Sequence, residues 1–316
     1  MRVATPRIPV LAAPTAAGKT AAAFALARAS RARIEVVSAD AMQVYCGLDI
    51  GTAKPSADER RRLSHHLIDV VEPTAGFSVA AYVRLAEGAI ADVLERGALP
   101  LVVGGTGLYL RALEEGLPGT PPADRERQAE IEAEMNERGL DALVAELHRA
   151  SPSDAARAGR NPRRIVRALE VLRATGRPAS MHGRRPPRFR YRTAVLLPGA
   201  AVLEGRIRER AREMIARGWL DEVVRLAPSM PQWATAAQAI GYDELRRHLE
   251  GAWSLDRALE RIDGATLRYA KRQRTWFRRT PSDATRWHAP AEGHLDDLLR
   301  WLEHDGAADG AEAPHA

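Results

Sequence analysis

Gly18, Lys19 and Thr20 are the residues near the start of the chain whose types and spacing could bind a phosphate group. They end a loop of small residues that follows a short apolar run, residues 8–13, and they precede an alanine-rich stretch, residues 21–31. This order predicts a buried strand, a loop and a helix, with backbone N–H groups and the helix N-terminus facing an anion. In such a loop Lys19 reaches the terminal phosphate oxygens, and the Thr20 hydroxyl faces a Mg²⁺ ion. The alternative is a chance Gly-Lys-Thr in a turn.

Position 13 departs from the usual pattern of a phosphate-binding loop, which has glycine where this chain has Ala13. Glycine is used in these loops because a residue needs positive φ or because a side chain would block the anion. We therefore expect Ala13 to lie at the strand end with negative φ, and Gly18 to be the position that tolerates no β-carbon. The residues expected to bind phosphate are Ala13, Pro14, Thr15, Ala16, Ala17, Gly18, Lys19 and Thr20.

Asp40 is a candidate general base, because it closely follows a second apolar, β-branched run at residues 34–38. In an open α/β sheet, ligands gather at the carboxyl ends of the strands, so Asp40 is expected beside the phosphate-binding loop. A cap of a helix N-terminus is the alternative role, and the sequence alone leaves both open. A third apolar run, residues 99–103, ends in Gly-Gly-Thr at residues 104–106, where many phosphate-loop kinases have a metal-binding Asp. A hydroxyl and bare backbone there favour binding of a leaving diphosphate.

The elements that must position these residues predict an α/β fold, with a parallel sheet of the phosphate-loop (P-loop) NTPase type flanked by helices. An all-helical lobe is expected to be inserted into this core, because apolar spacing indicates only helices between Pro122 and the next strand, residues 193–197. Helices are expected at residues 124–139, 140–150, 162–175, 203–217, 234–240 and 255–279. The expected domains are a discontinuous catalytic core at 1–118 and 192–304, an RNA-binding lobe at 119–191 and a disordered tail at 305–316.

The chain is strongly basic, with a net charge of +6 over 316 residues and a pI near 9.9, which favours a polyanionic partner. Only three of the 47 basic residues are lysines, so a lysine at position 19 indicates that a compact ammonium group is needed there. Residues 160–192 contain eleven arginines and a single acid, Glu170. A charge run is often only a solvated face, but one this one-sided favours contacts with phosphates.

Aromatic residues are interleaved with arginines near the C-terminus, where residues 268–279 contain Tyr269, Trp276 and Phe277. Such aromatics either stack on unpaired nucleobases or pack against the core, and the sequence favours neither. Cys46 is the only cysteine, which excludes an intrachain disulfide and a cysteine metal cluster. No apolar run is long enough to span a membrane, and we expect a cytoplasmic monomer without a signal peptide.

Eight separated segments, in one order across residues 8–290, closely resemble the bacterial tRNA dimethylallyltransferases, also called tRNA isopentenyltransferases. The resemblance covers most of the chain, so it is far more specific than a phosphate-binding loop alone. The segments are PTAAGKT (14–20), SADAMQVY (38–45), GLDIGTAKP (47–55), HHLID (65–69), VVGGTGLY (102–109), RALEV (167–171), QAIGY (238–242) and KRQRTWFR (271–278).

The resemblance implies transfer of a dimethylallyl group from dimethylallyl diphosphate to N6 of the adenosine 3′ of the anticodon in tRNA, with release of diphosphate. It implies Asp40 as general base, and Thr106 and Arg210 as further catalytic residues that contact the diphosphate. Gln128 departs from the family, because a basic residue that faces RNA is expected there, and Arg125 or Arg127 could replace it. The expected tRNA-binding residues are Asp40, Ala41, Met42, Gln43, Arg163, Arg164, Ile165, Val166, Arg167, Gln238, Ala239, Ile240, Gly241, Tyr242 and Asp243.

Two other functions fit parts of the sequence. A small P-loop kinase that uses ATP would explain residues 8–20 but would leave the basic insertion and the Gly-Gly-Thr strand end without a role. A non-catalytic RNA-binding module would explain the charge but not Lys19 and Asp40. The transferase is therefore the hypothesis that uses every segment.

Overall fold

The computed structural model describes residues 7–279, 283–288 and 293–303. The chain forms two compact units, one made of Met1–Glu114 and Arg188–Ala316 and the other of Glu115–Pro187. The domain boundaries predicted from the sequence, 118/119 and 191/192, lie four residues beyond those of the units. The predicted tail, residues 305–316, lies outside the described residues. Within the part of the chain that the structure describes, no helix is both long and apolar enough to cross a membrane.

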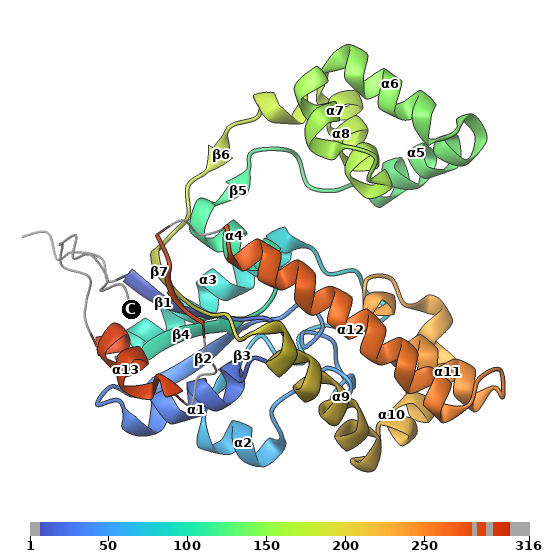
Figure 1. Cartoon of the computed structure of the whole chain (residues 1–316). Helices are drawn as coiled ribbons and strands as arrows, with labels where there is room; N and C mark the ends of the chain where they lie inside the picture. The colour runs from blue at the N-terminus through green and yellow to red at the C-terminus, as the bar shows by residue number, and fades with distance from the viewer. Residues whose placement is uncertain (1–6, 280–282, 289–292, 304–316) are drawn as a thin grey trace, which may run out of the picture. The chain divides into compact units, whose positions relative to one another are not determined.

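The first unit is built on a six-stranded parallel sheet with the strand order β3-β2-β4-β1-β7-β8 (Figure 1). The predicted α/β fold is confirmed, and the apolar runs at residues 8–13, 34–38 and 99–103 become β1, β2 and β4. Their side chains are buried almost throughout, as expected for parallel strands covered on both faces. The strands are β1 (Arg7–Ala12), β2 (Ile34–Ala39), β3 (His65–His66), β4 (Leu99–Gly104), β7 (Arg190–Leu196) and β8 (Thr285–Trp287).

Helices cover the sheet on both faces. Helix α1 contacts β1, β2 and β4 and also α13, whereas α3 packs against β2 and β4. Figure 1 shows that α1 and α3 lie on opposite sides of the sheet. The small side chains of Ala22 and Ala23 let α1 approach the strands closely, and Leu26 is fully buried there. These helices are α1 (Lys19–Ala29), α2 (Ala57–Arg62), α3 (Val79–Glu95), α4 (Gly107–Glu115) and α13 (Leu295–Glu303).

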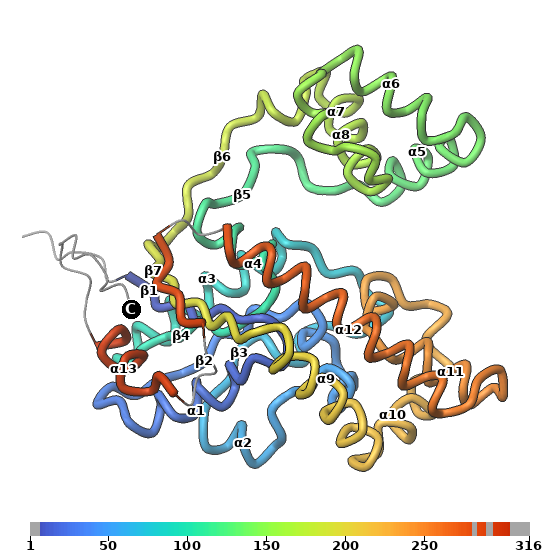
Figure 2. Tube along the Cα trace, viewed as in Figure 1, coloured from blue at the N-terminus to red at the C-terminus, as the bar shows by residue number. Residues whose placement is uncertain are grey.

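A second hydrophobic core in this unit joins the helices after β7 to the loop after β2. Trp219, Tyr242 and Ile262 pack there against Val44 and Leu48. The path of the chain in Figure 2 brings this loop beside helices that lie about 170 residues further along the sequence. The expected helix at residues 234–240 is wrong, because only a short 3₁₀ turn, Ala236–Gln238, forms there. The helices are α9 (Ala200–Ala216), α10 (Trp219–Leu226), α11 (Tyr242–Leu249) and α12 (Leu255–Phe277).

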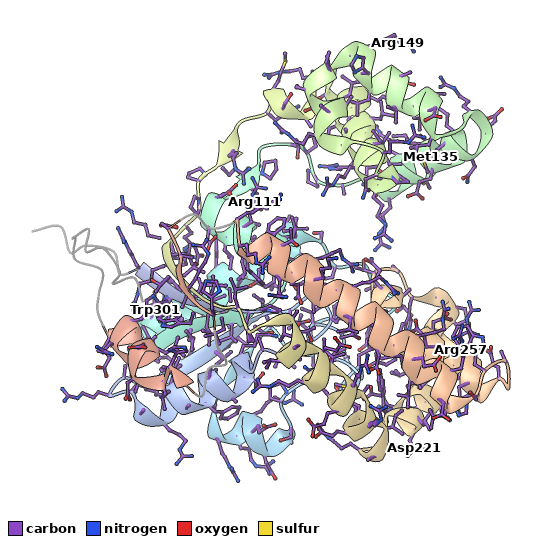
Figure 3. All side chains as sticks on the ribbon, viewed as in Figure 1. Arg111, Met135, Arg149, Asp221, Arg257 and Trp301 are labelled. Carbon is purple, nitrogen blue, oxygen red and sulfur yellow. The ribbon has the colours of Figure 1, made fainter. Side chains whose placement is uncertain are left out.

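The second unit is a helical lobe with its own core. Leu143, Leu147, Ile165 and Leu169 are fully buried in it, and Met135 lies among the packed helices in Figure 3. Two two-residue strands, which the sequence did not predict, pair antiparallel where the chain enters and leaves the lobe. Its elements are β5 (Leu117–Pro118), α5 (Arg125–Arg138), α6 (Leu140–Ala150), α7 (Pro152–Ala158), α8 (Pro162–Thr175) and β6 (Arg184–Arg185).

Candidate active site

The loop between β1 and α1 places a left-handed glycine directly before a helix N-terminus. Helix α1 begins at Lys19, and Gly18 before it has φ 84°, a left-handed conformation that favours glycine. Ala13 is buried and is not among the described residues with positive φ, so the expected backbone at this position is confirmed. The position that departs from expectation is Ala16, which has φ 60° without being glycine. The loop therefore has its one strained alanine at position 16.

Two neighbouring cavities share this loop. We call the first, of about 320 Å³, the apolar cavity, and the second, of about 420 Å³, the polar cavity. The residues that line both cavities are Thr15, Ala16, Lys19, Asp40, Thr52 and Arg210. The structure thus brings together three residues that the sequence singled out, Lys19, Asp40 and Arg210, at the junction of the cavities.

Helix α9 contributes apolar side chains to the first cavity and charged side chains to the second. Ile207, Ala211 and Met214 follow one another at intervals of about one turn and line the apolar cavity. Charged residues on the adjoining face, among them Arg206, Glu213 and Arg217, line the polar cavity. A molecule with a charged end and a hydrocarbon end would therefore fit across the junction.

The junction carries an excess of positive charge that is poorly hydrated. Burial lowers the pKa of Lys19 to about 8, while nearby Asp40 acts in the opposite direction and Arg210 adds to the lowering. Burial also lowers the pKa of Arg210, again against the attraction of Asp40. Two partly desolvated cations with one carboxylate favour the binding of a multiply charged anion, which would replace the lost hydration.

Asp40 caps a turn and also lines both cavities. One carboxylate oxygen, Oδ1, accepts hydrogen bonds from the backbone N–H of Met42 at 2.9 Å and of Gln43 at 3.4 Å, so it caps the turn that follows β2. The Thr106 hydroxyl accepts from the N–H of Ala41 at 2.9 Å and ties this turn to the end of β4. The same carboxylate lines both cavities. Turn and strand end together fix Asp40 in place.

Gln273 of α12 is a site residue to which sequence reasoning assigned no role. Its side chain is 7% exposed, and its Oε1 accepts from the Thr15 N–H in the phosphate-binding loop at 2.9 Å. Its Nε2 donates to the carbonyl of Gly105 at 2.7 Å. A β-carbon on Gly105 would lie 2.6 Å from that Nε2, and one on Gly104 would lie 2.2 Å from the carbonyl oxygen of Ala39. These two glycines, expected to leave bare backbone for diphosphate, are therefore required for close packing.

Glu222 of α10 anchors the loop after β2 in the same way. Its Oε2 accepts from the N–H groups of Asp49 at 2.9 Å and Ile50 at 2.7 Å. Its Oε1 accepts from the Gly51 N–H at 3.1 Å and from the Tyr242 hydroxyl at 2.7 Å. This buried carboxylate holds the 49–51 backbone, next to Thr52 in the cavity lining, against the second core.

Comparisons with known proteins show the family of this chain. The family model described as IPP transferase matches residues 43–280, and a second model, isopentenyl transferase, matches residues 6–77. The chain belongs to the IPP transferase family. Among curated relatives, the tRNA dimethylallyltransferase of Thermus thermophilus is 57% identical over 295 residues, 93% of this chain and 97% of the relative. That of Deinococcus radiodurans is 50% identical over 309 residues, covering 96% and 99%. The resemblance seen in the sequence is confirmed.

Solved structures of this kind also match the IPP transferase chain along most of its length. The full-length tRNA isopentenylpyrophosphate transferase of Bacillus halodurans has a TM-score of 0.67 at 36% identity, over 94% of this chain and 95% of that one. A eukaryotic dimethylallyltransferase acting on tRNA has a TM-score of 0.77 at 25% identity, over 94% and 77%. The match to each of these two structures covers 94% of the chain, so it includes sequence from both units.

The residues that this IPP transferase was expected to use for tRNA differ in exposure. Asp40, Ala41 and Met42 line the apolar cavity, as do Gln238, Ala239 and Ile240. Tyr242 is buried with its hydroxyl on Glu222, and Asp243 pairs with Arg246 and Arg247. Ile165 and Val166 are buried in the core of the lobe, so their side chains are not available to RNA.

The arginine-rich stretch is largely occupied by contacts within the protein. Buried Glu170 accepts from the Asp124 N–H at 2.6 Å and from the Gln128 side chain at 2.7 Å, and it pairs with Arg167 at 2.8 Å. Arg167 also donates to the carbonyl of Pro121. Arg167 thus helps to hold the entry of the lobe together, while 32% of its side chain stays exposed, and its contact with RNA stays a prediction. Gln128 likewise has a structural partner, whereas Arg125 is exposed.

The aromatic residues of α12 differ in their surroundings. Phe277 is 1% exposed and packs in the core. The Trp276 ring lies against Gly107, where a β-carbon would come within 2.4 Å of its Nε1. Tyr269 lines the apolar cavity, and burial raises its pKa. Of these three aromatic residues, Tyr269 alone lines a cavity, whereas Trp276 is half-buried outside both cavities.

Proposed function

We propose that this IPP transferase transfers a dimethylallyl group from dimethylallyl diphosphate to N6 of the adenosine 3′ of the anticodon in tRNA. The single observation that carries the proposal is the junction of the two cavities at Lys19, Asp40 and Arg210. A diphosphate in the polar cavity and a five-carbon chain in the apolar cavity would place the breaking C–O bond at that junction. We further propose that it acts in the cytoplasm, where both substrates would be dissolved, and that it acts as a monomer.

The reaction follows from the charges at this junction. An adenine amine is a weak nucleophile because its lone pair is delocalised into the ring, so Asp40 would take one N6 proton as the new C–N bond forms. The C–O bond of the allylic carbon breaks at the same centre, and negative charge builds on the departing diphosphate. Lys19, Arg210 and the N–H groups at the start of α1 would stabilise that charge where it develops.

We propose that Mg²⁺ binds to the protein through a single hydroxyl group, that of Thr20. Thr20 lines the polar cavity and lies in the first turn of α1, after the left-handed Gly18. Within the described residues no group of three or more His, Cys, Asp or Glu side chains could hold a metal ion. Mg²⁺ usually keeps several waters and binds through substrate phosphates and few protein ligands, so a Thr20 hydroxyl fits it. The ion would supply further charge neutralisation for the diphosphate.

For tRNA we propose that Arg163 and Arg164 of the lobe contact the phosphate backbone. Both are exposed in the first turn of α8, a fourteen-residue helix capped by Asn161. Helix N-termini favour anions, so the two guanidinium groups and the helix end act in the same direction. Arg173 is not included because it pairs with Glu134 and Glu146.

The decisive experiment is incubation of the purified protein with radiolabelled dimethylallyl diphosphate and bulk tRNA. Label should enter tRNA with release of one diphosphate per group transferred, and nuclease digestion should recover it on adenosine. Hydrolysis of ATP without transfer of label would instead favour a P-loop kinase. Binding of tRNA with neither reaction would favour the non-catalytic RNA-binding module.

Replacing both Arg163 and Arg164 by alanine should weaken tRNA binding and flatten its dependence on salt. Each phosphate contact contributes a slope of about −0.9 in a plot of log affinity against log salt for duplex nucleic acid and about −0.7 for single strands. We expect the slope to fall by about one to two in fluorescence titrations, with dimethylallyl diphosphate binding unchanged. The matched control replaces Arg61 and Arg62, two adjacent exposed arginines of α2. An unaltered slope in the α8 variant, or an equal loss in the control, would contradict the proposed contact.

The affinity for dimethylallyl diphosphate should fall as the pH rises above about 8. The Lys19 ammonium has a pKa of about 8, so it is charged below that pH and loses its charge above it. A bound anion favours the charged form, which predicts a decrease of up to about tenfold per pH unit just above pH 8. Calorimetric titrations between pH 7 and 9 measure this, with K19R as control because a guanidinium group keeps its charge. A decline of the same steepness in K19R would assign the titration to another group.

A further inference from the structure

Trp219 is the largest side chain in the lining of the apolar cavity, and its neighbours hold it tightly. It is 1% exposed, and its ring meets the Tyr242 ring edge-on with 5.9 Å between centroids. A β-carbon on Gly51 would lie 2.2 Å from the indole Nε1, and one on Gly241 would lie 2.2 Å from Cη2. Gly241 also has φ +100°, where other residues are strained. Two backbone segments are thus in direct contact with the indole.

The residues around Trp219 complete an apolar wall, which we define as Ala211, Met214, Trp219, Ala239 and Ile262. All five are buried members of the second core, whereas Ile207 and Ala16, which also line the cavity, pack with the core of the sheet. The cavity therefore lies between two packed cores. Packed interiors yield little to added volume, so this wall cannot move back without disturbing α10, α11 and the loop held by Glu222.

The size of the cavity makes this wall important for the substrate. A volume of about 320 Å³ is at the small end of the range of about 300–1,000 Å³ for ligand pockets. In the proposed reaction the target base and the hydrocarbon chain both need access to the junction with the polar cavity. If the hydrocarbon chain runs from the junction toward Trp219, a second isoprene unit would meet the wall.

We propose that the apolar wall, through Trp219 and Met214, limits the transferred group to five carbons and excludes longer prenyl diphosphates. This inference rests on the proposed function, and it assigns to Trp219 a specificity-determining role that the reaction chemistry does not need. Gly51 and Gly241, from two segments of the family resemblance, then serve to seat the indole that closes the cavity.

The test compares dimethylallyl diphosphate with geranyl diphosphate, which is one isoprene unit longer. Wild-type protein and the variants Trp219→Phe and Met214→Ala are assayed for transfer to tRNA and, separately, for binding of each diphosphate by calorimetry. A missing methylene in an apolar pocket changes specificity about 10–200-fold, so each variant should raise the geranyl-to-dimethylallyl ratio at least about tenfold. Leu203→Ala is the matched control, because Leu203 is a buried residue of α9 that packs in the sheet core and lines neither cavity.

The outcomes separate this inference from the proposed function. Binding ratios that shift in both wall variants but not in Leu203→Ala support the wall whether or not label reaches tRNA. Wild-type protein that transfers the ten-carbon group as readily as the five-carbon group overturns it. The inference is also overturned if both wall variants melt within a few degrees of wild type and keep the wild-type geranyl-to-dimethylallyl ratio. Loss of transfer in wild type with both diphosphates would count against the proposed function alone.

Discussion

Replacing Asp40 by asparagine should slow the chemical step by about 10²–10⁴ while leaving both substrates bound within a few-fold. Asparagine keeps the Oδ1 acceptor that caps the turn at Met42 and Gln43, so the local backbone is retained. What is lost is the carboxylate that would take the N6 proton. Single-turnover transfer from labelled dimethylallyl diphosphate, with tRNA and diphosphate affinities measured at pH 7, reports the two quantities separately.

Asp40 also affects the cations beside it, and the control must account for that. Its charge raises the pKa of Lys19 and of Arg210 against the effect of burial, so D40N should shift the titration of Lys19 to lower pH. Glu213→Gln removes a carboxylate that acts on Arg210 in the same sense but lines only the polar cavity. We expect E213Q to change the rate by less than about tenfold. A near-normal single-turnover rate in D40N would remove Asp40 from the role of base.

The parts of the fold and site that the sequence predicted depend on short-range patterns. Residues 8–20 contain a strand, a loop and a helix start within one segment, and each has a local signal. The position of Asp40 followed from one rule, that ligands gather at the carboxyl ends of parallel strands. The helices at 140–150 and 162–175 were predicted to the residue: Gly176 ends the second in a left-handed conformation, and Ser151 after the first is the N-cap of the next helix.

The contacts that complete the site could not be predicted from the sequence, because the residues that form them are far apart along the chain. Gln273 binds a loop 258 residues earlier, and Glu222 binds backbone N–H groups about 172 residues earlier. Nothing in the local pattern around Glu222 distinguishes such a contact from an ordinary surface position, and the resembling segment 271–278 did not reveal the partners of Gln273. A signal was present at Gly51 and Gly241, two glycines inside the resembling segments, but it did not reveal that both face the indole of Trp219.

The charge composition of the sequence likewise did not indicate which arginines form ion pairs within the protein. The stretch 160–192 was interpreted as an RNA-binding surface because it contains one acid, yet most of the acids that pair with its arginines lie outside it. Arg160 pairs with Asp141, and Arg173 pairs with Glu134 and Glu146 from two other helices. A count of charges along the sequence does not include acidic residues that folding places next to the arginines. The count therefore overestimated the unpaired positive charge that could contact RNA.

Replacing Gly18 by alanine should nearly abolish activity, whereas Ala13→Gly should change the affinity for dimethylallyl diphosphate by less than about tenfold, or 1.4 kcal/mol. Ala13 has an ordinary backbone, and its N–H donates to the Gly104 carbonyl at 3.1 Å, a bond that glycine keeps. Gly18 has φ 84° directly before Lys19, where an added β-carbon is strained and stands next to the bound anion.

A comparison with Ala16 distinguishes the two effects of a β-carbon, which are backbone strain and obstruction of the bound anion. At φ 60° it already bears the left-handed conformation, which costs about 1–2 kcal/mol for a residue other than glycine. Strain alone can therefore explain a loss of at most about 30-fold in Gly18→Ala, and it should appear as a lower melting temperature of the unliganded protein. A larger loss of diphosphate affinity would come from the side chain blocking the anion. Ala16→Gly, which relieves strain without adding an atom, should keep wild-type affinity within about tenfold. Equal tolerance at positions 16 and 18 would mean that the diphosphate does not approach the backbone at Gly18.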